Sequence, residues 1–167
     1  MKQRYYIPYG CFLLLTLFVL RFNLAGQTDI DAIMMEKNAF CVGPMYSHSS
    51  WKNYWEGTLK RDNLNLGRVS TNAYSVMGNY GITRKLNLLF SLPYIKTKAS
   101  AGTMKGFNGI QDLSLFAKWR AYHKKQGNGI LSIYGIAGLS MPVSNYVADY
   151  LPLSIGLKSK TASVRLM

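Results

Sequence analysis

The chain has 167 residues and a formal net charge of +13, from 20 Lys and Arg against 7 Asp and Glu. This length accommodates one domain with a sizeable core. The basic residues stand at turns and segment ends rather than in one stripe, which argues against nucleic acid as a partner. Contact with anionic lipid headgroups or an anion-favouring lumen fits the charge better.

Residues 1–26 have the organisation of a secretory signal peptide. Lys2 and Arg4 form a positive start, Cys11–Leu20 is an unbroken apolar run, and small residues precede Gln27. The alternative of an uncleaved anchor is disfavoured because the run is too short to span a bilayer. Cleavage near residues 25–27 removes three basic residues and lowers the net charge from +13 to +10.

Downstream of the signal, the composition argues against disulfides and metal sites. No apolar stretch is long enough for a spanning helix. Cys41 is the single remaining cysteine, so no intrachain disulfide is expected. His48 and His123 fall on different predicted segments without ligand spacing, so we expect neither a metal nor a cofactor.

Six segments then alternate between apolar and polar residues with the period of two that is typical of strands. The expected strands cover residues 38–49, 69–80, 86–96, 110–121, 130–141 and 161–167. In the clearest one, Leu86, Leu88, Phe90, Leu92 and Tyr94 share one face. An apolar face of this length suits a tilted strand that crosses a bilayer.

The connections between these strands are alternately long and short. Residues 50–68 (a loop with hairpin character), 97–109 and 142–160 are long, whereas 81–85 and 123–129 are tight turns, the latter closing with Asn-Gly. Outer-membrane barrels have this asymmetry, with short periplasmic turns and longer external loops, whereas a soluble up-and-down barrel has no reason for it. We therefore predict an all-β, antiparallel transmembrane up-and-down β-barrel over residues 27–167, with its N-terminus in the periplasm.

About six strands are fewer than the eight of the smallest usual barrels. The last alternation is also cut off at Met167. The expectation is an N-terminal part of a barrel, a truncated product that needs further strands or self-association, because open sheet edges are not viable in lipid.

Three stretches resemble a known family. They are Tyr80–Thr83 (YGIT) with Leu86–Leu88 (LNL), Gly109–Arg120 (GIQDLSLFAKWR) and Gly138–Pro142 (GLSMP). Together they are similar to outer-membrane barrels of the phenol-degradation (MetA-type) transporter family, over roughly residues 40–167. The resemblance implies a barrel in the outer membrane of a Gram-negative bacterium that passes small, often apolar molecules. It implies no catalytic residues.

Asp112, Lys118 and Arg120 have the parity opposite to Leu113, Leu115 and Trp119. If the apolar set faces lipid, the charged set faces the lumen, because Lys or Arg at mid-bilayer costs about 2–4 kcal/mol. These three residues either form a charged wall that orients solutes or pair internally and fill the barrel.

Aromatic residues near the strand ends are candidates for the interfacial girdles of such a barrel. They are Trp51, Trp55, Tyr80, Tyr94 and Trp119. For Trp51 and Trp55, stacking on a ligand is the alternative role. The parity of the predicted lumen side is not uniformly polar, since it also includes Ile130, Tyr134, Ile136, Leu89 and Ile95. Either the lumen suits apolar solutes, or residues outside this part of the protein cover it.

Two competing functions remain: a barrel-borne lipid-modifying enzyme and a soluble secreted β-barrel binding protein. Ser47-His48-Ser49-Ser50 places hydroxyls beside a histidine, but adjacent residues of a strand point to opposite faces, which disfavours a Ser47–His48 pair. Gly156–Thr161 lacks the second glycine of a phosphate loop and is read as a basic loop. We expect no catalytic residue; the predicted partners are outer-membrane lipids and a small solute.

Overall fold

The computed structural model describes residues 28–167, and the predicted signal peptide, residues 1–26, lies outside that part of the chain. The described residues contain no helix of the length and apolarity needed to span a membrane. Their regular elements are the strands β1 (Phe40–Trp51), β2 (Asn53–Glu56), β3 (Leu59–Asp62), β4 (Val69–Thr83), β5 (Leu86–Ala99), β6 (Asn108–Ile110), β7 (Asp112–Gln126), β8 (Gly129–Pro142) and β9 (Thr161–Leu166). The predicted all-β class is confirmed.

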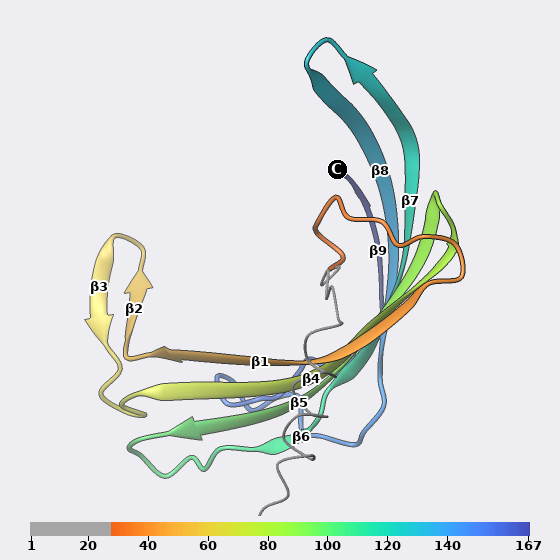
Figure 1. Cartoon of the computed structure of the whole chain (residues 1–167). Coiled ribbons are helices and arrows are strands. Elements are labelled where there is room, and N and C mark those ends of the chain that lie inside the picture. The colour runs from red at the N-terminus through yellow and green to blue at the C-terminus, as the bar shows by residue number, and fades with distance from the viewer. Residues whose placement is uncertain (1–27) are drawn as a thin grey trace, which may run out of the picture.

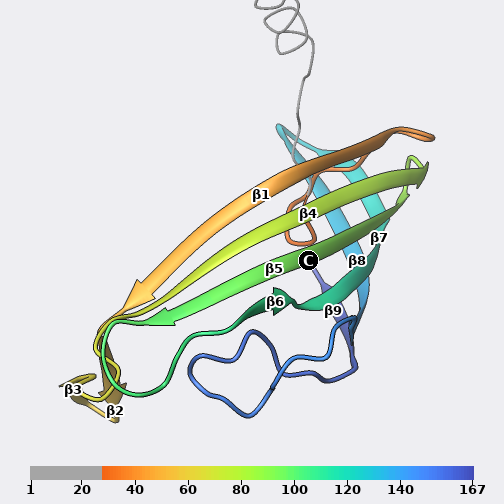
Figure 2. The same cartoon turned by 90° about the horizontal axis from the view of Figure 1, so that it is seen from below.

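The main sheet is an antiparallel meander. Its order is β1-β4-β5-β7-β8-β9, with β6 paired to β5, while β2 and β3 form a separate hairpin. The sheet is strongly curved, and β7 and β8 rise steeply from β1, β4 and β5 (Figures 1 and 2). Within residues 28–167, β1 and β9 are the two edges and do not pair with each other. The antiparallel arrangement is confirmed, whereas closure into a barrel stays a prediction.

The connections alternate in length as predicted. Two-residue turns at Arg84–Lys85 and Gly127–Asn128 join β4 to β5 and β7 to β8. Gly127 has a φ of 59°, in the left-handed region that glycine enters without strain. Longer connections hold the β2–β3 hairpin and β6, and one spans residues 143–160. Because the sheet is a meander, the short and the long connections lie at opposite ends of it.

Several strands are longer than the sequence predicted. β7 continues to Gln126, although the alternation predicted its end at Ala121. A register shift between Arg120 and Tyr122 keeps the ladder intact, so that the polar residues from His123 onward still pair with β8. Backbone hydrogen bonds pair these charged and polar strand ends. Because the ends lack the alternation of apolar residues by which strands are recognised in a sequence, the prediction stopped too early.

The two faces of the sheet differ in chemistry. We call the face that is covered by the chain's own residues 28–37 and 143–160 the inner face, and the opposite one the outer face. The outer face is apolar, and includes Val42, Tyr46, Tyr74, Val76, Leu88, Leu92, Leu115, Ala117, Trp119, Ala137, Leu139 and Val164. The inner face carries most of the polar side chains, including Ser75, Asn79, Asn87, Ser91, Thr97, Asp112, Ser114, Lys118, Ser140 and Arg165.

The apolar side chains that are buried on the inner face form small clusters under the two covering segments. Leu153, which is 0% exposed, packs with Leu66 and Val69. Ile155 and Tyr146 pack on Ile95. Figure 2 shows the connection between β8 and β9, which carries Leu153, Tyr146 and Ile155, beside β6. The described residues themselves therefore cover the apolar side chains of this face, a role that the sequence assigned, as one of two alternatives, to residues outside this part of the protein.

Among the residues predicted to line the interior, Leu89, Ile95, Tyr134 and Ile136 are buried. Ile130 differs, because it pairs with Lys125 near the tip of the β7–β8 hairpin and is 67% exposed. The hairpin tip extends past the covered part of the sheet, so correct parity alone does not bury Ile130.

Candidate functional site

The candidate site is the middle of the inner face, where residues 28–32 lie against β7, β8 and β9. Lys118 is its central residue: its side chain is 0% exposed. The Nζ atom donates to the carbonyl oxygen of Thr28 at 2.5 Å, to that of Asp31 at 2.9 Å and to Asp31 Oδ1 at 3.0 Å. All three donors of the ammonium group are thus used, as a buried charge requires.

Two further side chains hold the same segment. The Tyr134 hydroxyl donates to the carbonyl oxygen of Ala32 at 2.9 Å. The Arg165 guanidinium pairs with the Asp29 carboxylate at 2.5 Å and lies 5.6 Å from the centre of the Phe116 ring. Residues 28–32 are therefore held by one strand residue each from β7, β8 and β9.

The Asp31 carboxylate is stabilised in its charged form. Burial raises its pKa, but hydrogen bonds from the Thr28 backbone, the Lys118 side chain and the Ile33 backbone outweigh burial and leave the pKa below its ordinary value. A carboxylate with a lowered pKa stabilises the folded state above its unfolded pKa, and that stability is lost as the pH falls through the folded pKa.

We therefore predict that residues 28–32 detach as the pH falls below about 4, the ordinary range of an aspartate. The detachment is measured by hydrogen exchange of these amides, with the observed rates corrected for the pH dependence of the intrinsic exchange rate. Asp31→Asn removes the titrating group and serves as the control, so its exchange should lack this acid-dependent step. A wild-type step that persists unchanged in the variant would refute the assignment to Asp31.

The stretch that follows residues 28–32 contacts β4 at Gly81. The Gly81 carbonyl accepts from the Asn38 amide at 2.7 Å, and a Cβ at Gly81 would lie 2.0 Å from the Glu36 carbonyl oxygen. We predict that Gly81→Ala pushes this backbone away and lowers the free energy of unfolding by about 1–3 kcal/mol. Gly43, also on the inner face but with nothing within 4 Å of its Cβ position, is the matched control, and Gly43→Ala should be near neutral in urea unfolding.

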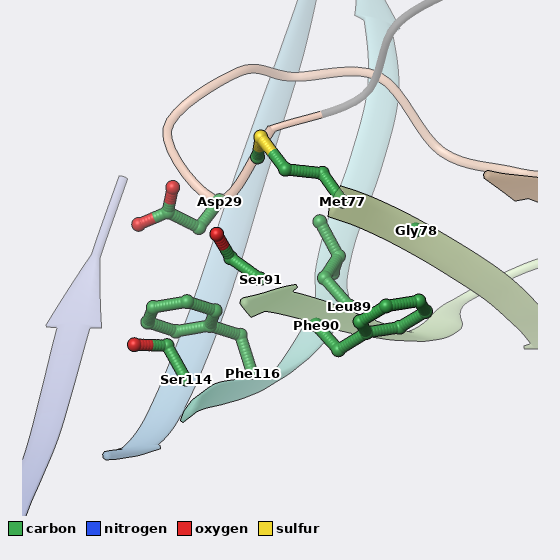
Figure 3. Close-up of a pocket in the computed structure, with 8 residues that line it drawn as sticks. All are labelled: Asp29, Met77, Gly78, Leu89, Phe90, Ser91, Ser114 and Phe116. Atoms are coloured by element: carbon green, nitrogen blue, oxygen red, sulfur yellow. The ribbon is translucent and has the colours of Figure 1, made fainter. Parts of the chain in front are cut away.

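A cavity of about 190 Å³ lies between residues 28–32 and the sheet. Figure 3 shows Asp29 on the segment and Ser91, Ser114 and Phe116 on the strands, and the remaining lining residues are Met77, Gly78, Leu89 and Phe90. Ser91, Ser114 and Ser140 pair across β5, β7 and β8, so they place a row of hydroxyl groups on this face. The lining combines apolar surface with hydroxyls and one carboxylate.

A second contact region lies nearer the long connections. The Tyr146 hydroxyl donates to Asp112 Oδ1 at 2.5 Å and accepts from the Lys158 amide at 2.7 Å. Burial, followed by the neighbouring Asp112, raises the pKa of Tyr146. Thr97 donates to the Leu153 carbonyl oxygen at 2.6 Å. These bonds fix residues 143–160 on the inner face.

The structure places all three predicted lumen-facing residues on the inner face, but it does not bring them together. Asp112 accepts a hydrogen bond from Tyr146, and Lys118 donates to Asp31 in residues 28–32. The Nη2 atom of Arg120 donates to the Arg84 carbonyl oxygen at 3.0 Å, near the short turn. Arg120 Nε is buried without a partner among the described residues. The internal pairing that the sequence offered as an alternative occurs for Lys118, with Asp31 rather than Asp112.

The predicted interfacial aromatics fall in different places. Tyr94, Tyr80 and Trp119 lie on the outer face and are 41%, 40% and 54% exposed. Trp51 has the parity of the inner face and pairs with Val69. Trp55 lies on β2, in the hairpin that projects past the end of β1 (Figure 1).

A row of tyrosines on the outer face was missed in the sequence. Tyr46 pairs with Tyr74 and Tyr74 with Tyr94, so three tyrosines from β1, β4 and β5 stand side by side. In the next row toward the long connections the same face carries His48, Asn72 and Lys96 in register. The outer face therefore changes from apolar to polar at the tyrosine row. The periodicity of each strand indicated the face, but only the register aligned the three residues.

His48 belongs to this polar row and not to a catalytic pair. Its Nδ1 lies 2.8 Å from Asn72 Oδ1, and the Tyr46 hydroxyl donates to the same oxygen at 2.9 Å. Ser47 points to the opposite face. Among the described residues, no group of three or more His, Cys, Asp or Glu side chains is arranged to hold a metal ion.

Asp29, Asp31 and Arg165 were also missed. Residues 29–37 precede the first expected strand, and residues 161–167 were predicted only as a final strand. The available signal was the parity of Arg165, which matches that of the polar positions in the other strands.

Comparisons with known proteins do not identify a family. No family model matches the chain, and no curated protein and no solved structure is significantly similar to it. The resemblance to outer-membrane transporters therefore stays an expectation, and the chain's own surfaces are the basis for its function.

Proposed function

We propose that this chain is an outer-membrane protein whose curved sheet forms part of the wall of a transmembrane β-barrel for small, partly apolar solutes. The observation that carries the proposal is the inversion of the two faces: apolar side chains point outward, and charged and hydroxyl side chains point inward. A soluble barrel places its apolar residues inside.

The dimensions of the outer face support a lipid environment. Along β5, the band from Tyr94 to Leu86, which pairs with Trp119, covers about 27 Å at roughly 3.4 Å per residue. A strand tilt of about 40° reduces this to roughly 20 Å across the membrane, compared with about 25 Å for the apolar band of known outer-membrane barrels. The band is bounded by Tyr46, Tyr74 and Tyr94 on one side and Trp119 on the other, where interfacial aromatics belong.

The free edges set a condition for insertion. Backbone groups of β1 and β9 that face away from the sheet need partners in hydrocarbon. Strands outside the described residues, or those of a second copy of the chain, have to supply them. Membrane insertion is therefore coupled to edge pairing.

The inner face supports passage of solutes that are partly apolar and partly polar. Leu89 and Phe116 line the cavity together with the hydroxyls of Ser91 and Ser114. A wall of this composition wets poorly compared with that of a porin, yet it offers hydrogen bonds. This combination favours small amphipathic solutes over fully hydrophilic ones such as inorganic ions.

Liposome swelling tests the proposal. Protein that is extracted only with detergent and has heat-modifiable gel mobility should, once reconstituted, speed swelling in isosmotic solutions of small solutes. Heat-denatured protein in the same liposomes is the control. Protein that stays soluble in buffer without detergent, or folded protein that inserts without any solute flux, would contradict the proposed function.

A further inference from the structure

The strongest unassigned feature is the matched charge between residues 28–32 and the inner face. Lys118 pairs with Ile136, and Ile136 pairs with Arg165, so the two basic residues lie in one row, two strands apart. Neighbouring strands are about 4.8 Å apart, which separates the two backbone positions by roughly 10 Å. The segment presents a carboxylate to each: Asp31 to Lys118 and Asp29 to Arg165.

We infer that Lys118 and Arg165 form a binding site for small dicarboxylates, which Asp29 and Asp31 occupy as a tethered ligand. Two other basic strand residues have the parity of the inner face: Arg120, near the short turn, and Lys125, near the tip of the β7–β8 hairpin. Among the described strands of the main sheet, Asp112 is the acidic residue of this face, and it accepts a hydrogen bond from Tyr146. Asp29 and Asp31 therefore supply the negative charges that Lys118 and Arg165 do not find on neighbouring strands.

The surroundings suit a ligand of this class. Lys118 is fully buried, so its ammonium group needs an anionic or strongly polar partner to offset the loss of hydration. Arg165 lies against the Phe116 ring, which orients the guanidinium. Ile136, which is buried, stands between Lys118 and Arg165 in the same row and offers apolar surface to the carbon chain between two carboxylates. A dicarboxylate thus satisfies both cations and the surface between them.

The tether explains why the site is self-occupied. A ligand on the same chain acts at an effective concentration of the order of millimolar, so a free dicarboxylate has to compete with it. Binding of the free ligand displaces residues 28–32 from the inner face. This inference rests on the proposed function for the route by which a solute reaches the site, but its binding test needs no transport.

Calorimetric titration of the full chain in detergent micelles with glutarate tests the site. Asp29→Asn together with Asp31→Asn removes the competing charges, and we expect glutarate to bind at least tenfold more tightly than to the wild type. Adding Lys118→Met to this double variant should abolish that binding. The uncharged diamide of glutarate, which has the same shape, should not bind to any of the three proteins.

Two results would overturn the inference: a folded double variant that binds glutarate no better than the wild type, or one that binds the diamide equally. If the double variant does not fold, hydrogen exchange of wild-type residues 28–32 decides. Glutarate should speed their exchange more than sodium chloride of equal ionic strength, and equal effects would mean screening only. Intact binding without liposome flux would contradict the proposed function alone.

Discussion

Lys118→Met should release residues 28–32 from the inner face and lower the protection of their amides against hydrogen exchange by about 100-fold. The substitution keeps most of the buried volume but leaves the Asp31 carboxylate and the Thr28 carbonyl oxygen without the ammonium donor. Removing one partner of a buried ion pair costs about 3 kcal/mol, and Asp31, whose side chain is 24% exposed, regains part of its hydration. Hydrogen exchange with mass spectrometry measures the protection directly.

Two further variants calibrate this result. Tyr134→Phe removes one neutral hydrogen bond to the same segment and should cost about 1 kcal/mol. Lys124 lies on the same strand as Lys118 but is exposed, so Lys124→Met should leave residues 28–32 protected. If Lys118→Met exchanged like Lys124→Met, the segment would not be anchored at Lys118.

Val76→Arg should destabilise the protein in lipid vesicles by about 1–3 kcal/mol, because it places a charge inside the outer apolar band, one row from Tyr74. Val76 lies on β4, pairs with Pro44 and Leu92, and is 50% exposed. In a soluble protein, a substitution at a half-exposed site away from special features usually changes stability by less than about 0.5 kcal/mol. The size of the effect therefore distinguishes lipid from water around this face. Urea unfolding in vesicles gives the free energy.

Ser70→Arg is the matched control. Ser70 lies on the same strand and the same face, but beyond Tyr74, in the polar part next to Lys98. An arginine there should cost less than about 1 kcal/mol, since charge near the interface is tolerated. Equal costs at Ser70 and Val76 would mean that the tyrosine row marks no boundary between water and lipid.

The sequence predicted the alternating faces and the alternating connections because both are local properties. Side-chain parity in β5 follows from a period of two within one stretch, and Asn128 with its flanking glycines marks a turn on its own. The strand class, the antiparallel order and the position of each long connection follow from these signals. The inner-face location of Lys118 also follows from parity alone.

The contacts across the inner face were not predictable in the same way. Thr28 and Lys118 are 90 residues apart, and nothing in the sequence of residues 28–37 marks them as a partner of β7. Likewise, the alignment of Tyr46, Tyr74 and Tyr94 depends on the register between strands, which the alternation of single strands leaves open. The site is therefore built from long-range pairings, whereas the scaffold is built from local ones.

The contact of the outer face with lipid is tested most directly by two labels on β1. Val42 and Met45 are 48% and 45% exposed and lie on opposite faces, so only their surroundings differ. With Cys11 and Cys41 replaced by serine, a bimane label is attached to Val42→Cys or to Met45→Cys, and the proteins are reconstituted with brominated lipids. We predict strong quenching by the lipid at position 42 and little at position 45. Equal quenching at both positions, or none at position 42, would contradict an outer face that contacts the bilayer.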